Sequence, residues 1–311
     1  MEIRMGRFLA LGHLTIDEVF YEGRKLRERL GGSVAYGSLA AISMGWEVSI
    51  VSVVGEDMPK SFLQKLSSLG ADISHVKTIE GHSTRFRVEV SGSREVLSRP
   101  KSAPALRLSD IPREIEKAHV IFLGSVGKEI SVDLINKIKN IARGLIAIDL
   151  QGFIREFGPK GEVSLTRNKK VFEASSFCDV IHLSREECVT ATGTSQLRKG
   201  VEKFLNTGAQ VVSITMGEKG GIVADKEEIL YVPAIKPERV VDDVGAGDVF
   251  LAVLSICLAE NIDLKTSSAI ASAAASLSTE LDGPSLLDKS EIERRSKSIM
   301  PLITYLASES L

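Results

Sequence analysis

The sequence predicts an α/β protein built on a doubly wound, mainly parallel sheet with a small β lid. Short apolar runs of strand length alternate with helical runs along most of the 311 residues. That alternation is typical of right-handed βαβ units with helices on both faces of a sheet. Segments 13–30 and 82–100 instead resemble antiparallel hairpins with one wet face. We therefore expect residues 1–311 to form a single domain with these two segments inserted as a lid.

The parallel sheet is expected from short apolar runs, each of buried-strand length and bounded by polar or turn residues. In chain order these strands are Phe8–Leu11, Val48–Val54, His119–Leu123, Leu145–Leu150, Val180–Leu183 and Val211–Thr215. Between them lie runs with apolar residues at helical spacing, some of which stop at a glycine. These helices are Ser33–Met44, Lys60–Leu69, Val132–Ile141, Glu186–Ala191 and Gln196–Leu205. From Gly245 onward the chain is expected to be nearly all helical.

The lid is expected from two hairpins. The first joins Thr15–Tyr21 to Lys25–Arg29 around Gly23, and the second joins Thr84–Val90 to Glu95–Ser98 through the turn signal Ser91-Gly92-Ser93. In the second hairpin Phe86 and Val88 alternate with Arg85 and Arg87, so the two kinds of side chain lie on opposite faces. Such an appendage either closes over a site or forms a dimer contact, and a homodimer through the lid stays open.

Composition narrows the range of partners. A net charge of −2 gives no general attraction to nucleic acid or to an anionic membrane, so neither is expected as a partner. The apolar run near the N-terminus is too short for a signal sequence, and the longest apolar stretch, Val249–Leu258, is too short for a membrane span. The three cysteines lack a metal-binding spacing and leave one unpaired, which suits a reducing compartment. We therefore expect a cytoplasmic protein.

The segment most informative about chemistry begins a long apolar helix. Gly245, Ala246 and Gly247 let the backbone approach an anion with free N–H groups and the positive end of the helix dipole. Asp248 follows in the first turn, beside that anion site. A carboxylate there would repel a phosphate unless it took part in the reaction, and removal of a proton from an attacking hydroxyl is such a role. The alternative is that Asp248 only caps the helix.

The run Asp242-Asp243-Val244-Gly245-Ala246-Gly247-Asp248 resembles the DTxGAGD signature of the ribokinase/PfkB family of carbohydrate kinases. Similar matches recur along nearly the whole chain: Gly12–Asp17, Leu30–Ala35, Ala40–Gly45, Val51–Asp57 and Thr215–Gly221. The segment Asp149-Leu150-Gln151-Gly152-Phe153-Ile154-Arg155 is more similar to archaeal sugar kinases and inositol kinases. The resemblance implies a ribokinase-like fold and an ATP-dependent phosphotransferase with an alcohol group as acceptor.

The resemblance also implies roles for individual residues. Asp248 would be the general base, with Gly245, Ala246 and Gly247 as the anion hole. The implied substrate-binding residues are Asp17, Gly31, Gly32, Ser33, Gln151 and Arg155, and the implied nucleotide-binding residues are Ser184, Thr215, Gly217 and Gly220. Glu187 would be an outer partner of Mg²⁺, which retains waters and needs few carboxylates. The resemblance leaves open whether a monovalent cation is a further cofactor.

The chain departs from the family pattern at several positions. Ser184 stands where the family usually has Asn, and with Glu187 it also fits a capping box, so a plain helix cap stays open. Tyr36 stands where many members have an Asn that often reads a sugar hydroxyl. Asp243 replaces the usual threonine of the signature, which puts the monovalent-cation loop in doubt. For Arg155, a surface position is the alternative to phosphate contact.

These observations predict a kinase that transfers the γ-phosphoryl group of ATP to a hydroxyl of a sugar, cyclitol or other polyol. Its expected ligands are that small-molecule substrate and the nucleotide. Asp17 and Gln151 are suited to reading hydroxyls, and the polyol is therefore favoured over a nucleoside.

The alternatives are a nucleoside kinase of the same fold and a catalytically idle ligand-binding protein. Phe86, Tyr36 and Phe153 are available to form a slot for a nucleobase. Phe86 facing inward would favour that alternative, whereas Arg87 facing inward would favour a polyol or an already phosphorylated sugar. The sequence leaves open both the acceptor and the choice between ATP and ADP as donor.

Overall fold

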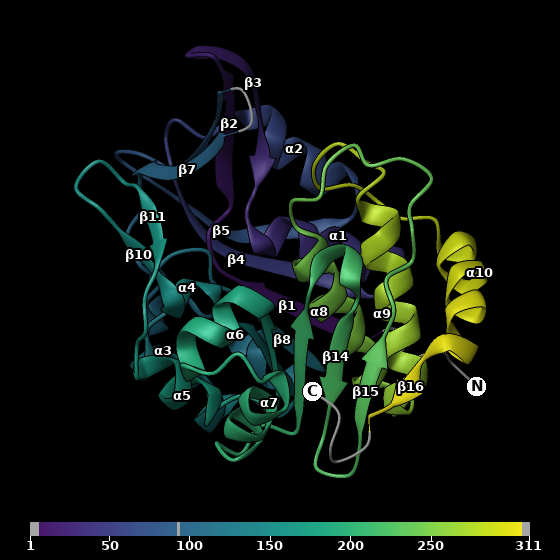
Figure 1. Cartoon of the computed structure of the whole chain (residues 1–311). Coiled ribbons are helices and arrows are strands. Elements are labelled where there is room, and N and C mark those ends of the chain that lie inside the picture. The colour runs from purple at the N-terminus through teal and green to yellow at the C-terminus, as the bar shows by residue number, and fades with distance from the viewer. Residues whose placement is uncertain (1–5, 92–93, 307–311) are drawn as a thin grey trace.

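The computed structural model describes residues 6–91 and 94–306, and within them a ten-stranded sheet forms the centre of the molecule. Its strand order is β16-β15-β14-β13-β12-β9-β8-β1-β4-β5 (Figure 1). The strands from β5 to β13 run parallel to their neighbours, and β14, β15 and β16 pair antiparallel. The bounds are β1 Arg7–Leu11, β4 Glu47–Gly55, β5 Ala71–Ile79, β8 Val120–Gly124, β9 Leu145–Asp149, β12 Val180–Ser184, β13 Val211–Thr215, β14 Gly221–Ala224, β15 Ile229–Val232 and β16 Thr304–Tyr305.

Helices cover both faces of this sheet, and each face has its own hydrophobic core. One layer contains α1 Ser33–Ser43, α2 Lys60–Ser68, α8 Ala246–Ala259, α9 Leu264–Ser278 and α10 Lys289–Ile299. The other contains α3 Val132–Ile141, α4 Gln151–Ile154, α5 Lys170–Ser175, α6 Arg185–Thr192 and α7 Leu197–Leu205. Short 3₁₀ turns lie at Leu108–Asp110, Arg113–Lys117, Gly217–Lys219 and Met300–Leu302. The predicted doubly wound, mainly parallel α/β fold is confirmed.

A second sheet, called the small sheet below, has the order β3-β2-β6-β7 and lies at the top of Figure 1. Its bounds are β2 Thr15–Tyr21, β3 Arg24–Gly31, β6 Thr84–Ser91 and β7 Arg94–Lys101. β2 and β6 pair in parallel, which joins the two predicted hairpins into one sheet. A ribbon of β10 Arg155–Phe157 and β11 Val163–Leu165 adjoins β7 through a bridge between Ser98 and Glu162. Of the predicted turn, Gly92 and Ser93 lie outside the described residues.

Several elements carry no clear sequence signal. β5 is an edge strand with its side chains mostly half-buried or exposed, so it lacks the apolar run that marks the inner strands. β10 and β11 are short and partly exposed, and β16 contains only two residues in an otherwise helical region. These short strands are defined by their pairing with neighbouring strands. The pattern of residues within each segment does not reveal that pairing.

The parallel strands all end at one edge of the sheet, and ligands of open α/β sheets bind at that edge. β9 ends at Asp149, β12 at Ser184 and β13 at Thr215, which brings three of the quoted sequence segments together. The loop after β1 leads directly into β2 and Asp17. The order of the strands therefore places the predicted site residues between this edge of the large sheet and the small sheet.

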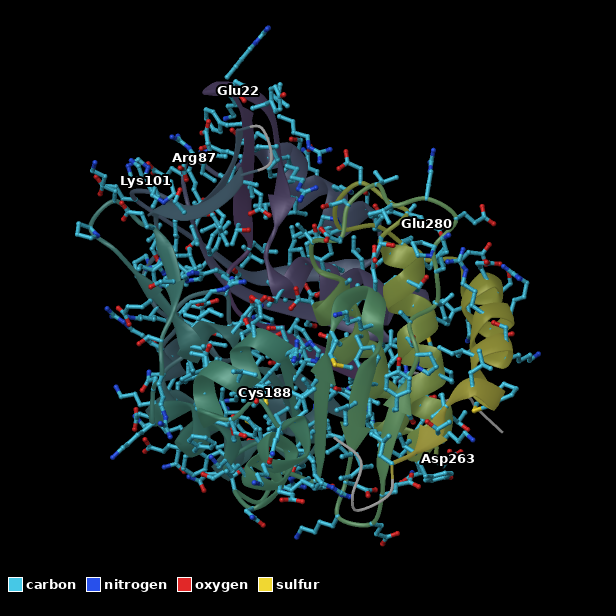
Figure 2. The ribbon with its side chains drawn as sticks, viewed as in Figure 1. Glu22, Arg87, Lys101, Cys188, Asp263 and Glu280 are labelled. Atoms are coloured by element: carbon cyan, nitrogen blue, oxygen red, sulfur yellow. The ribbon has the colours of Figure 1, made fainter. Side chains whose placement is uncertain are left out.

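Cys178, Cys188 and Cys257 are free and buried, and burial raises the pKa of the Cys188 thiol to about 11 (Figure 2). Within the described ranges, no helix is long and apolar enough to cross a membrane.

Candidate active site

The N-terminus of α8 is built to receive an anion. Gly245 is its N-cap with φ 80°, and no side chain within the described residues caps the helix. The first N–H groups of a helix lack helical acceptors and carry the positive end of its dipole. Only glycine fits at position 245, because a β-carbon there would lie 2.3 Å from the ring of Tyr36. The packing of α1 against α8 thus keeps this backbone bare.

Asp248 lies in the first turn of α8 and is buried, with 8% of its surface exposed. Its Oδ1 has no hydrogen-bond partner among the described residues. Burial raises the pKa of Asp248 to about 6, although the Ser33 hydroxyl and Arg155 lower it. A carboxylate with this pKa is mostly ionised at pH 7 and is a stronger base than an ordinary aspartate. Its position beside the anion site suits proton removal from a hydroxyl.

Two further acidic side chains, Asp149 and Glu187, lie close to Asp248. Asp149 is buried, and its pKa is raised well above the ordinary value by burial and by the charges of Glu187 and Asp248. Glu187 is also buried and raises the pKa of Asp248. Because neighbouring buried carboxylates repel one another, this group favours a bound cation. Asp149 was quoted within a sequence segment but was not among the predicted site residues.

Ser184 and Glu187 cap α6. The Ser184 N–H donates to Glu187 Oε2 at 2.8 Å, and the Glu187 N–H donates to Ser184 Oγ at 3.3 Å. This is the capping box that the sequence left open as an alternative. The cap uses one oxygen of the Glu187 carboxylate, so it does not by itself exclude a metal role for the other.

Asp17 lies within β2 of the small sheet, and Asp242 and Arg155 are among its charged neighbours. Thr15 Oγ1 donates to Asp17 Oδ1 at 2.7 Å, and Arg29 on β3 is its cross-strand neighbour. Burial raises the pKa of Asp17, and Arg29 lowers it. A β-carbon on Gly31 would lie 2.1 Å from Asp17 Oδ2, so the di-glycine loop and this carboxylate touch. Gly32 follows as the N-cap of α1.

Arg29 connects the small sheet to the segment that precedes the anion hole. Its guanidinium forms a bidentate ion pair with Asp242, in which Nη1 donates to Oδ2 and Nη2 donates to Oδ1 at 3.2 Å. Both side chains are largely buried, with 12% and 8% exposed. The sequence analysis did not predict a role for Arg29. Arg29 is the residue opposite Asp17 in the pairing of β2 with β3. That position could point to a role for Arg29 only once the pairing is known.

The faces of the small sheet are also decided by strand pairing. Phe86 is in register with Asp17 and is buried, but it belongs to neither hydrophobic core. Arg87 is in register with Glu18 on the opposite face, donates to its Oε2 at 3.4 Å and stacks over Phe20. Phe86, and not Arg87, therefore faces the site.

Gln151 is the first residue of α4, which follows β9, and Arg155 comes directly after that helix. Gln151 Nε2 donates to Ser33 Oγ at 3.1 Å, which links the β9 loop to the start of α1. Arg155 is half-buried, its Nη1 lies 3.4 Å from the Val126 carbonyl, and its charge lowers the pKa of Asp248. The structure thus places both residues near Asp248.

A cavity of about 370 Å³ lies on the other side of the α8 N-terminus. Thr215, Gly217 and Gly220 line it, together with Ala246 and Gly247 of the predicted anion hole. Much of the remaining wall is apolar, from Val232, Ala234, Ile235, Pro237, Val240, Phe250 and Ala275. Ser184 does not line this cavity, since it caps α6. Three of the four predicted nucleotide-side residues therefore meet here, and their roles stay predictions.

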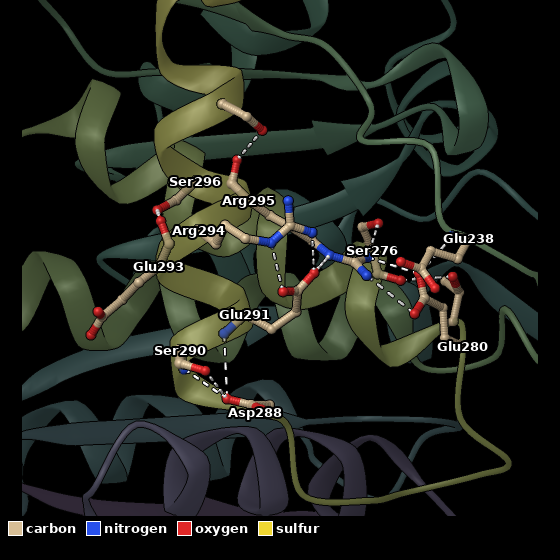
Figure 3. Close-up of polar contacts among 12 residues, drawn as sticks. Glu238, Ser276, Glu280, Asp288, Ser290, Glu291, Glu293, Arg294, Arg295 and Ser296 are labelled. Atoms are coloured by element: carbon tan, nitrogen blue, oxygen red, sulfur yellow. Dashed lines mark hydrogen bonds and ion pairs between the residues drawn. The ribbon is translucent and has the colours of Figure 1, made fainter.

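The loop over this cavity is held by the end of α9. The N–H groups of Val241 and Asp242 both donate to the Thr279 carbonyl, at 2.8 and 3.1 Å. The Glu238 N–H donates to Glu280, and Glu280 forms a bidentate ion pair with the buried Arg295 of α10 (Figure 3). The C-terminal helices thus fix the loop that leads into the anion hole.

His182 on β12 is in register with Asp149 of β9 and lies close to Gly247 at the start of α8. Ser213 Oγ donates to the Ile181 carbonyl at 3.2 Å, so the His182 Nδ1–H donates to that hydroxyl at 2.9 Å. Its Nε2 then points toward Gly247 as an acceptor, 3.4 Å from Thr215 Oγ1. Burial lowers the pKa of His182 to about 4, so it stays neutral.

The fold carries a bare helix N-terminus, a buried carboxylate beside it and a cavity next to both, an arrangement that suits a small-molecule kinase. The chain belongs to the pfkB family of carbohydrate kinases, whose family model matches residues 7–290. This match confirms the predicted family. The curated relatives and solved structures of the family are kinases, which confirms the prediction of an ATP-dependent phosphotransferase over that of an idle binding protein.

Curated relatives have diverse acceptors. The chain is 28% identical to a cytidine kinase of Thermococcus kodakarensis over 78% of this chain and 84% of that protein. It is 28% identical to an inositol 3-kinase of Arabidopsis thaliana over 94% and 81%, and 25% identical to a nucleoside kinase of Methanothermobacter thermautotrophicus over 88% and 90%. Their names do not select one acceptor for this chain.

Solved structures share the fold. A ribokinase of Arabidopsis thaliana, complexed with ribose and ATP, has a TM-score of 0.76 at 18% identity, covering 94% of this chain and 99% of that chain. A pyrophosphate-dependent kinase of the ribokinase family, complexed with a pyrophosphate analog and myo-inositol, has a TM-score of 0.77 at 18% identity, covering 92% and 99%. At this identity the likeness concerns the fold alone.

Proposed function

We propose that the protein transfers the γ-phosphoryl group of ATP to a hydroxyl of a sugar, cyclitol or similar polyol. The observation that carries this proposal is Asp248, a buried carboxylate with a raised pKa and a partnerless oxygen, placed beside the bare N-terminus of α8. That arrangement serves a reaction in which a hydroxyl must lose its proton next to a phosphate.

The proposed reaction is an in-line displacement. The acceptor oxygen attacks the γ-phosphorus while Asp248 takes the hydroxyl proton, the bond to the β-phosphate oxygen breaks, and ADP leaves. The first N–H groups of α8 stabilise charge on the phosphate oxygens. The nucleotide would occupy the cavity beside Thr215 and Gly217, whose apolar wall suits a nucleobase.

The acidic group fits a magnesium ion. Asp149, Glu187 and Asp248 are buried. The charges of Glu187 and Asp248 raise the pKa of Asp149, the charge of Glu187 raises the pKa of Asp248, and Arg155 is a nearby positive charge. Among the described residues no group of three or more His, Cys, Asp or Glu side chains is placed to hold a metal ion by itself. Mg²⁺ keeps several waters and accepts one or two carboxylates plus phosphates, so Glu187 and Asp149 would be its partners here. When bound, the ion would neutralise phosphate charge.

The polar lining of the acceptor side supports a hydroxyl-rich substrate. Asp17, Ser33 and Gln151 present acceptors and donors from three chain segments. A nucleoside is the second candidate, because Phe86 faces the site and could stack on a base. A ribose moiety would satisfy the same polar groups.

The test is a panel of ribose-type sugars, inositols and nucleosides with MgATP, measuring ADP formation and the phosphorylated product. We expect a polyol to have the highest kcat/KM. If the kcat/KM of a nucleoside exceeds that of every polyol by more than about tenfold, equivalent to about 1.4 kcal/mol of transition-state preference, the nucleoside becomes the favoured acceptor. Absence of product with every acceptor would contradict the proposal.

A further inference from the structure

The loop between β8 and α3 contains a buried carboxylate that the proposed reaction does not use. Glu129 is 1% exposed, and its carboxylate accepts hydrogen bonds from the backbone N–H groups of Val126 and Gly127, both at 2.7 Å. Ser125 Oγ donates to the same carboxylate at 3.5 Å. Hydrogen bonds to an ionised acceptor are roughly twice as strong as those between neutral groups, so this carboxylate fixes the direction of two successive N–H groups.

The backbone beside Glu129 has a conformation that residues other than glycine rarely adopt. Lys128 has a φ of 67°, in the left-handed region. Such a conformation costs free energy and persists where surrounding contacts hold it. Glu129 supplies contacts of this kind, because its carboxylate binds the loop and its carbonyl accepts from the Leu106 N–H at 2.9 Å. The loop therefore has a defined shape that Glu129 maintains.

The two residues whose N–H groups bind this carboxylate present their carbonyls to two arginines. Arg155 Nη1 donates to the Val126 carbonyl at 3.4 Å, and Arg99 Nη1 donates to the Gly127 carbonyl at 2.6 Å. Arg99 belongs to β7 of the small sheet, and its guanidinium lies 3.4 Å from the ring centroid of Phe157 in β10. The buried carboxylate thus takes the donors of the loop, and the guanidinium groups take its acceptors.

The loop also contacts the segment that carries Arg155. A β-carbon on Gly152 in α4 would lie 2.1 Å from Ser125 Oγ, so the loop after β8 packs directly on this helix. Arg155 comes immediately after α4. The position of its guanidinium therefore depends on the loop in two ways, through the packing of α4 and through the Val126 carbonyl.

Arg155 is a positive charge shared by three carboxylates of the candidate active site. It lowers the pKa of Asp17 on β2, of Asp149 at the end of β9 and of Asp248 on α8. A phosphate group that approaches Asp248 is repelled by these carboxylates, and a cation held among them reduces that repulsion. The reaction therefore depends on where this guanidinium is held.

We propose that Glu129 is a positioning residue for phosphoryl transfer, which fixes the loop after β8 so that the Val126 carbonyl holds the Arg155 guanidinium among the three carboxylates. Glu129 does not contact the reacting atoms and acts through Arg155. The proposal rests on the proposed function and deepens it, because it explains how the cation near the general base is kept in place. It does not depend on the identity of the acceptor.

A double-mutant cycle of Glu129→Gln and Arg155→Met tests this route. Arg155→Met removes the cation and should lower kcat about 10²-fold. Glu129→Gln keeps the size of the side chain but turns an amide donor toward a backbone N–H, so the loop shifts and kcat should fall about tenfold. In the Arg155→Met background the same change should lower kcat less than about twofold, because the group that it positions is gone. The KM of ATP should stay constant with Glu129→Gln, since Glu129 does not line the proposed nucleotide cavity.

Ser131→Ala is the matched control in the same segment. Ser131 caps α3, where its Oγ accepts from the Leu134 N–H at 3.1 Å, and it has no contact with Arg155 among the hydrogen bonds of the described residues. The control should lower the melting temperature and leave kcat unchanged in both backgrounds. If Glu129→Gln does not fold, Glu129→Asp takes its place in the cycle, because it keeps the charge and shortens the reach by one methylene.

The cycle is measured with the best acceptor of the sugar, inositol and nucleoside panel. Equal losses of kcat for Glu129→Gln in the two backgrounds, or a loss no larger than that of Ser131→Ala, would overturn the inference and leave the proposed function intact. If the wild type forms product with no acceptor of the panel, the proposed function fails and the role of Glu129 fails with it.

Discussion

Asp248 meets two opposing demands. Catalysis requires an ionised carboxylate with a free oxygen, whereas burial favours the protonated form and raises the pKa to about 6. In the folded state the proton is therefore held more tightly than in the unfolded chain, where the pKa is near 3.8. Stability gained from this group is fully present below the unfolded pKa and is lost as the pH rises through about 6. The active site is thus stabilised less at the pH where it works.

The change Asp248→Asn separates the two demands. We expect kcat to fall about 10²- to 10⁴-fold, with the KM of ATP little changed, because the amide keeps the shape but cannot take the proton. At pH 7.5 the variant should be more stable than the wild type, by an amount on the order of 1–3 kcal/mol. Thermal melts and steady-state kinetics measure both effects.

The control for this prediction is the pH series. The stability difference should disappear near pH 4, and kcat/KM of the wild type should fall about tenfold per pH unit below pH 6. If Asp248→Asn keeps more than a tenth of the wild-type kcat, Asp248 is not the general base. A flat wild-type profile between pH 5 and 7 would argue against the raised pKa.

Among the elements, α6 shows how one helix start can serve structure and chemistry together. Ser184 and Glu187 form a reciprocal cap, and Glu187 also lies close enough to Asp149 and Asp248 to raise their pKa values. The capping box orients the Glu187 carboxylate at the end of β12, where the parallel strands deliver the other site residues. Cap and metal partner are therefore compatible roles for the same residue.

The pair Glu187→Gln and Ser184→Ala distinguishes these roles. The Gln side chain can still accept from the Ser184 N–H, so stability should change little, while the Mg²⁺ concentration for half-maximal activity should rise about 10-fold or more. Ser184→Ala removes the cap and should cost about 0.5–2 kcal/mol of stability without shifting the metal titration. If Glu187→Gln and the wild type have identical metal titrations, Glu187 caps α6 and has no role in binding the metal.

In the molecule as a whole, the small sheet is tied to the C-terminal half by ion pairs. Arg29 pairs with Asp242 and lies 3.4 Å from Asp282, and Arg27 pairs with Asp282 at 2.7 Å. These contacts join β3 to the segments before α8 and after α9. If the small sheet is a lid, as we propose, they stabilise its closed position over the acceptor, and weaker contacts lower the fraction of closed molecules.

Asp282→Asn tests the lid. Asp282 is 57% exposed, so the loss of its ion pairs should change global stability by less than about 1 kcal/mol. We expect the acceptor KM to rise about two- to fivefold and the ATP KM to stay constant, with the same shift in the wild type at high salt. Glu47→Gln is the matched control, since it breaks a similarly exposed pair with Arg7 away from the lid. Equal acceptor KM values for Asp282→Asn and the wild type would contradict a lid held closed by these pairs.

Local patterns in the sequence determined the fold class and the centre of the site. Apolar runs mark the inner strands because those strands are buried on both faces, and the glycines before Asp248 mark a helix start that must stay bare. The resemblance of the run 242–248 then indicated the family, which the match over residues 7–290 confirmed. Each of these signals is contained within a few consecutive residues.

Only the tertiary structure decided which residues surround that centre. Arg29 and Asp242 are 213 positions apart and meet where β3 of the small sheet contacts the segment before α8. Strand register turned Phe86 inward and Arg87 outward, and helix packing placed Tyr36 on Gly245. The raised pKa values of Asp149 and Asp248 arise from burial and from neighbours brought by other strands. Such contacts depend on distance in space and on exclusion of water, neither of which is written in the order of residues along the chain.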